Sequence, residues 1–138
     1  MRQGELVFAD SGAWIALALS RDPLHVQARS NGTCCKQRAP KLYTSVPVVI
    51  GTFTFLDRNA NPDVALTWKE AVYKPGTVNI LPCQLRDLEQ SWEYFRRSDL
   101  YKLSVVDATS FAIMKRERIW VSYAFDHHFA VVGFRLVG

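Results

Sequence analysis

The sequence predicts an α/β fold in three layers, α/β/α, with a central, mostly parallel sheet. Short apolar runs of strand length alternate along the chain with longer segments of helical period, an order typical of parallel sheets. Three of these runs close with an aspartate, at Asp10, Asp107 and Asp126. Because the carboxyl ends of parallel strands share one edge of the sheet, we expect these acids to meet where α/β folds place their chemistry.

The first half of the chain begins with a short buried strand and an Ala- and Leu-rich helix, which Asp10 or Ser11 caps. Asp22-Pro23 begins a second helix, and Asn31-Gly32 is expected to end it. The ranges predicted here are a strand at 5–9, a helix at 11–19, a loop at 35–41 and a strand at 42–46.

Residues 47–56 carry conflicting signals. Their β-branched and aromatic content favours a strand, whereas Pro47 directly after Thr44-Ser45-Val46 favours a helix start. Propensity alone predicts a strand here.

The second half of the chain alternates more clearly. Leu88, Trp92 and Phe95 recur at helical spacing and predict an amphipathic helix. The ranges predicted here are helices at 61–73 and 87–97, strands at 78–81 and 120–125, a helix from Asp107, a short helical segment from Asp126 and an edge strand at 133–137.

Composition places the chain among ordinary globular proteins. Its 138 residues are 49% hydrophobic and 22% charged, which fits one folded domain over residues 1–138 and excludes disorder. No apolar run approaches the roughly 20 residues that span a bilayer, and the start does not resemble a signal peptide. We therefore expect a cytoplasmic protein without a membrane segment. The net charge of +4 suits a polyanionic substrate.

The three aspartates indicate a metal site. Converging carboxylates repel one another unless a cation lies between them, and carboxylate oxygens are preferred ligands of Mg²⁺ and Mn²⁺. The pattern therefore favours metal-dependent phosphoryl transfer. The alternative is that each acid only caps the helix that follows it.

Three motifs, in order along the chain, resemble the PIN-domain family of small metal-dependent ribonucleases, which includes the VapC-type toxins. They are FADSGAWIALALSRDPLHVQA (8–28), SVVDATSFAIMKRERI (104–119) and VSYAFDHHFAVVGFRLV (121–137). The resemblance implies a helix at 47–56. It also implies an endoribonuclease in which Asp10, Asp107 and Asp126 hold Mg²⁺ or Mn²⁺ for hydrolysis of RNA. A cognate antitoxin and a homodimer are further implications.

One position departs from the family pattern. The family normally carries a Glu on the helix after the second strand, and the aligned position here is Gly51. No carboxylate lies within residues 46–56. This departure predicts a weakened enzyme, and its alternative is an impaired PIN domain that binds RNA or a protein without cutting.

Other polar residues have two interpretations each. Ser11 and Ser110 support a metal ligand or phosphate, or serve the helices only. Arg96, Arg97 and Lys102 precede Asp107 and are candidates for RNA binding, against an ordinary solvated surface. The four tryptophans could stack on bases, but Trp14 and Trp92 fit the apolar faces of their helices better.

The adjacent His127 and His128 cannot both face one ion from a regular helix, so a phosphate contact or a plain surface position is the better interpretation. A third class, aspartyl-phosphate phosphatases and receiver domains, is disfavoured. Such a phosphatase needs a second acid where Gly12 stands, and a receiver needs an acidic pair near the first strand.

Overall fold

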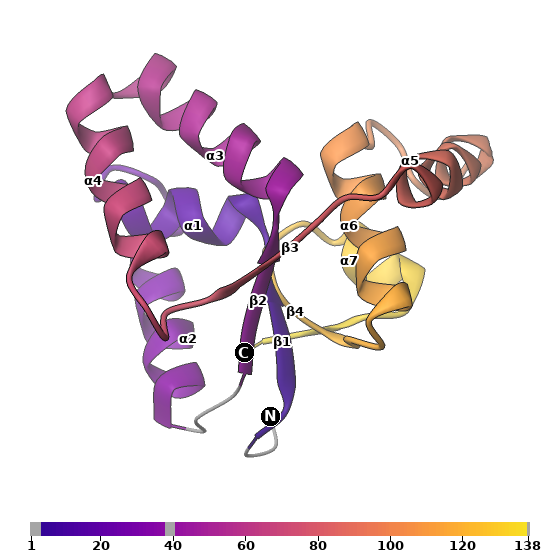
Figure 1. The fold of residues 1–138 in the computed structure, drawn as a ribbon, viewed down its shortest axis with the longest axis horizontal. Helices are drawn as coiled ribbons and strands as arrows, with labels where there is room; N and C mark the ends of the chain where they lie inside the picture. The colour runs from indigo at the N-terminus through magenta and orange to yellow at the C-terminus, as the bar shows by residue number, and fades with distance from the viewer. Residues whose placement is uncertain (1–3, 38–40, 138) are drawn as a thin grey trace.

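Five parallel strands form the centre of the protein, and helices cover both faces of the sheet (Figure 1). The computed structural model describes residues 4–37 and 41–137, and the side chains of residues 33–37 lie outside that description. Figure 1 shows α1 to α4 on one face and α5 to α7 on the other. The predicted three-layer α/β/α fold is therefore confirmed.

The strands are β1 (Leu6–Ala9), β2 (Lys41–Ser45), β3 (Asn79–Leu81), β4 (Val121–Tyr123) and β5 (Arg135–Leu136). The helices are α1 (Ser11–Ala18), α2 (His25–Gln37), α3 (Val46–Asn59), α4 (Pro62–Tyr73), α5 (Leu85–Ser91), α6 (Val105–Arg116) and α7 (His128–Val132), with a 3₁₀ helix η1 (Trp92–Arg96) after α5. No helix in the described ranges is long and apolar enough to cross a membrane.

The strand order β3-β2-β1-β4-β5 places β1 beside β4, although more than 100 residues separate them in the chain. Ala9 is in register with Tyr123, and the Asp10 N–H donates to the Tyr123 carbonyl at 3.0 Å. The chain leaves β1 toward β2 on one side and reaches β4 on the other, so the strand order reverses at β1. Open α/β sheets bind ligands at such a reversal of strand order.

Helix α6 is the most deeply packed helix. Its residues from Asp107 to Met114 are all buried, because it lies between the sheet and helix α5. The Phe111 ring packs edge-on against Phe129 and Tyr94, with centroid distances of 4.9 and 5.1 Å. This aromatic cluster fixes the position of α6, and with it the position of Asp107.

Helix α2 is longer than predicted. It continues through Asn31-Gly32 to Gln37, so residues 35–37 of the predicted loop are helical, Lys41 belongs to β2, and residues 38–40 lie outside the described residues. Gly32 is explained by close packing: a Cβ there would lie 3.2 Å from the Tyr123 hydroxyl oxygen. The Tyr123 hydroxyl in turn donates to the Ala28 carbonyl.

Residues 46–59 form helix α3, as the family resemblance implied and against the strand that propensity predicted. The Ser45 hydroxyl caps the helix by accepting from the Val48 N–H at 3.4 Å, and Pro47 occupies the first turn. Both features favour a helix start strongly enough to override the β-branched run.

The amphipathic prediction for residues 87–97 was wrong about the buried face. Trp92 and Phe95 are 47% and 45% exposed, while Asp87, Ser91 and Tyr94 are buried. The chain tightens into a 3₁₀ helix at Trp92, which rotates the face that an α-helix would present. Asp87 is turned inward by its ion pair with Arg116 of α6.

Replacing Arg116 with Met should lower the free energy of unfolding by about 3–5 kcal/mol, because the Asp87 carboxylate, 1% exposed, would remain buried without its cation. Urea unfolding followed by circular dichroism measures the change. Arg96→Met is the matched control, because the Arg96 side chain is 79% exposed. A loss no larger than that of the control would contradict a structural role for the pair.

Candidate metal centre

Asp10 follows β1 and caps helix α1. Its Oδ2 accepts the Gly12 N–H at 3.4 Å, and its Oδ1 accepts the Ser11 hydroxyl at 3.5 Å. The residue is 3% exposed. Burial raises the pKa of Asp10 from 3.8 to about 6; the Ser11 and Gly12 N–H groups lower it, and the Asp126 charge adds to the rise.

Asp107 lies in the first turn of α6, not at the end of a strand as the sequence predicted. The apolar run before it enters the helix, because the Ser104 hydroxyl caps α6 and accepts the Asp107 N–H at 3.0 Å. Desolvation raises the pKa of Asp107 from 3.8 to about 8, and the Asp10 and Asp126 charges contribute further. A side-chain hydrogen bond with Asp126 raises this pKa, whereas one with Ser104 lowers it.

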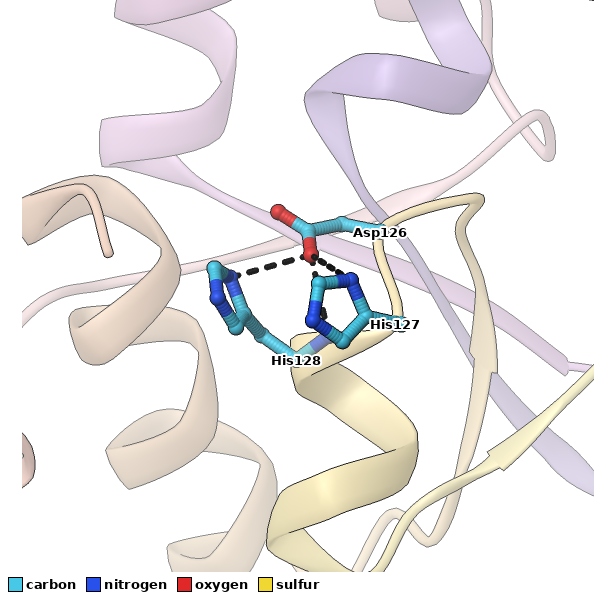
Figure 2. A group of neighbouring side chains, drawn as sticks. All are labelled: Asp126, His127 and His128. Atoms are coloured by element: carbon cyan, nitrogen blue, oxygen red, sulfur yellow. Dashed lines mark hydrogen bonds and ion pairs between the residues drawn. The ribbon is translucent and has the colours of Figure 1, made fainter. Parts of the chain in front are cut away.

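Asp126 follows β4 in the loop that leads to α7 (Figure 2). Its Oδ1 accepts the His128 N–H at 2.9 Å. Its side chain is 34% exposed, so Asp126 opens the site to solvent. Asp10 and Asp107 are buried, so the half-buried Asp126 is the most accessible of the three carboxylates.

The three predicted acids come from three separate segments and lie near enough for their charges to affect one another. The negative charges of Asp10 and Asp126 both raise the pKa of Asp107. Among the described ion pairs, none joins Asp10, Asp107 or Asp126 to a Lys or Arg. Three carboxylates with excess negative charge and no described Lys or Arg partner suit a hard divalent cation.

Gly51 lies on α3 and faces the first turn of α6. A Cβ at this position would lie 3.8 Å from the Val106 Cγ2, an ordinary van der Waals contact. Val106 directly precedes Asp107, so a longer side chain at position 51 would begin beside the acid cluster. A Cβ at position 51 would therefore be accommodated without a steric clash.

The supporting residues differ in their placement. The Ser11 hydroxyl donates to the Asp10 carboxylate at 3.5 Å. The Ser110 hydroxyl is buried and donates to the Val106 carbonyl at 3.0 Å, so its described hydrogen bond stays within α6.

The three basic candidates lie on the surface before α6. The Arg97 guanidinium forms two hydrogen bonds with Asp99, at 2.9 and 2.7 Å. Arg96 pairs at 3.8 Å with Glu93, and the Lys102 ammonium lies 5.5 Å from the Tyr101 ring centroid. No described contact joins them to the aspartates.

Sequence reasoning missed two residues of the site. Ser104 and Asp107 have the spacing of a capping box, S-x-x-D, which predicts a helix start at Ser104. For His128 the sequence predicted a phosphate contact or a surface position, but the residue is 4% exposed and lies against Asp126. No pattern in the sequence distinguishes its burial from the exposure of His127.

Comparison with known proteins agrees with this geometry. Residues 7–135 match the PIN domain. The chain belongs to the PIN-domain family. The 23S rRNA-specific endonuclease VapC20 of Mycobacterium tuberculosis is 35% identical over 130 residues, which cover 94% of this chain and 95% of the relative.

Two solved structures share the fold. The crystal structure of Mycobacterium tuberculosis VapC20, a Sarcin-Ricin loop cleaving toxin, superposes with a TM-score of 0.82 at 32% identity. It covers 93% of this chain and 95% of its own. The crystal structure of DNA-bound VapBC from Salmonella typhimurium superposes with a TM-score of 0.61 at 13% identity, and covers 99% of this chain and 97% of its own. At this low identity the similarity supports a shared fold and nothing more.

The metal-free PIN domain should lose stability as the pH rises from about 4 toward 8. Over this range the unfolded chain releases the Asp107 proton, with its ordinary pKa of 3.8, whereas the folded chain keeps it until about pH 8. Asp107→Asn should remove most of this slope and raise the free energy of unfolding at pH 8 by about 1–3 kcal/mol. Thermal unfolding in a chelator, recorded against pH, measures both effects.

Asp57→Asn is the matched control, since Asp57 is exposed on α3. It should keep the wild-type slope. A loss of stability in Asp107→Asn at pH 8 would contradict the repulsion between the three acids.

Proposed function

We propose that this protein is a metal-dependent endoribonuclease that hydrolyses RNA phosphodiester bonds and acts as the toxin of a toxin–antitoxin pair. The observation that supports the proposal is the mutual electrostatic effect of Asp10, Asp107 and Asp126, which contributes to the raised pKa values of Asp10 and Asp107. A second support is sequence similarity: the protein is 35% identical to a 23S rRNA-specific endonuclease over 94% of its own length. Ribosomal RNA of the large subunit is the substrate class that this relationship supports.

The three aspartates would hold one or two Mg²⁺ or Mn²⁺ ions. When bound, such an ion supplies Lewis acidity toward a water nucleophile and the scissile phosphate. Ser11 and the Gly12 N–H orient the Asp10 carboxylate. The Ser104 hydroxyl and the His128 N–H do the same for Asp107 and Asp126. Each carboxylate is thus held by a donor from the start of the adjacent helix.

The RNA is attracted by the basic surface before α6. Arg96 and Lys102 are exposed. Their described partners, Glu93 and Tyr101, are also exposed, so both basic side chains remain on the surface. Arg97 is neutralised by Asp99, so Arg97 contributes less to RNA binding than its charge implies. The net charge of +4 favours approach of a polyanion to the carboxylate-lined site.

The proposed partner is an antitoxin protein, and the proposed setting is a cytoplasmic homodimer. An apolar hollow between α1 and α4 is lined by Trp14, Leu17 and Trp68, and would accept apolar side chains of such a partner. The similarity of this chain to a VapC protein supports the proposal that it binds an antitoxin. The solved structure from Salmonella typhimurium that shares its fold is a VapBC assembly.

Gly51 supports a second candidate function, a PIN domain that binds RNA or a protein and cuts slowly or not at all. The family's Glu would add a fourth carboxylate beside Asp107. Its absence weakens cation binding, because three carboxylates supply less negative charge and fewer ligand atoms.

Cleavage of ribosomal RNA fragments and single-stranded RNA with Mg²⁺ or Mn²⁺ separates the two candidates. Wild type should cut with added metal, and Asp10→Asn should reduce the rate by about 100-fold or more, because loss of a cation ligand removes several kcal/mol of transition-state stabilisation. Gly51→Glu should increase apparent metal affinity by about tenfold. Gly51→Ala is the matched control for helix propensity and should not change metal affinity.

Cutting by Gly51→Glu alone would favour the binding module as the native role. Metal-dependent cutting that survives Asp10→Asn would contradict the three-aspartate site. Absence of cutting by every variant would contradict the ribonuclease.

A further inference from the structure

Two imidazole rings lie against Asp126 (Figure 2). The Nδ1 atoms of His128 and His127 are 3.0 and 3.7 Å from the Asp126 Oδ1. One potential ligand atom from each of the three residues lies within 4.8 Å of the others. His127 directly precedes α7, which begins at His128, and the rings of both residues lie against Asp126 (Figure 2).

His128 gives an independent indication of a ligand. Its side chain is 5% exposed, yet neither ring nitrogen has a hydrogen-bond partner. The Nδ1 atom lies 3.0 Å from the Asp126 Oδ1, within ion-pair distance, whereas Nε2 has no described partner. A buried ring nitrogen without a hydrogen-bond partner requires an explanation, and a bound ion is one of the few available. Helix capping explains the backbone N–H of His128 but leaves its ring unexplained.

The spacing matches the ligands of a small transition-metal ion. Zinc–nitrogen and zinc–oxygen bonds of about 2.0–2.1 Å place tetrahedral ligands about 3.3 Å apart. The distances of 3.0 and 3.7 Å lie on either side of that value. Imidazole nitrogen suits Zn²⁺ and related ions, whereas Mg²⁺ prefers oxygen.

We propose that Asp126, His127 and His128 form a second cation site, which takes Zn²⁺ or a similar nitrogen-preferring divalent metal and shares Asp126 with the three-aspartate site. His128 is the buried anchor. His127, with a side chain 78% exposed, closes the site from the solvent side and leaves an entry path. This proposal does not depend on nuclease activity, because it concerns binding alone.

Calorimetric titration of the full chain with Zn²⁺ in excess Mg²⁺ tests the site. Wild type should bind one Zn²⁺ under these conditions, and His127→Ala and His128→Gln should weaken that binding by at least about tenfold. Mg²⁺ affinity, titrated separately, should stay unchanged in His127→Ala. His25→Ala is the matched control, because His25 lies on α2 with its Nδ1 2.6 Å from the Ala16 carbonyl oxygen, and it should bind Zn²⁺ like wild type.

Nitrogen-15 NMR of the imidazoles gives a second readout. Zn²⁺ should shift the ring resonances of His127 and His128 and leave those of His25 in place. If His128→Gln fails to fold, His127→Ala still tests the site, because the exposed His127 side chain can be removed without disturbing the core. Wild-type Zn²⁺ affinity in His127→Ala, or displacement of Zn²⁺ by Mg²⁺ in the wild type, would overturn the proposal, because the ion would then lie on the carboxylates alone.

Discussion

Asp10, Asp107 and Asp126 repel one another in a site where two of the three carboxylates are withdrawn from water. Asp10 and Asp107 are 3% and 8% exposed, and burial is the largest cause of the raised pKa of each. The folded chain can relieve this repulsion with protons or with a cation. The placement of β1 beside β4, and the deep packing of α6, serve to bring these charges together against their electrostatic preference.

Helix starts hold each carboxylate in place. Asp10 accepts from Gly12 and Ser11, Ser104 caps α6 beside Asp107, and the His128 N–H donates to Asp126. Such donors orient anionic oxygens without neutralising them, so the charge remains available to a cation. Gly51 of α3 lies against the same turn of α6, where a Cβ would contact Val106 at 3.8 Å.

Much of this arrangement could be predicted from the sequence, because apolar runs that end in an acid mark β1 and β4 well. The run before Asp107 was misinterpreted, since its β-branched residues resemble a strand while Ser104 and Asp107 together specify a helix start. Exposure of Trp92 and burial of Asp87 could not be predicted, because they depend on a 3₁₀ turn and on Arg116, 29 residues further along. The burial of His128 likewise depends on tertiary packing.

The measurement that most directly tests the central claim is the number of protons released when Mn²⁺ binds. Calorimetry at pH 7 in two buffers of different ionisation enthalpy gives this number. Because the folded pKa of Asp107 is about 8, the account predicts release of about one proton per bound Mn²⁺ at the three-aspartate site. It also predicts that Asp107→Asn releases almost none. Binding of Mn²⁺ without proton release by the wild type would contradict a cation site built from three mutually repelling aspartates.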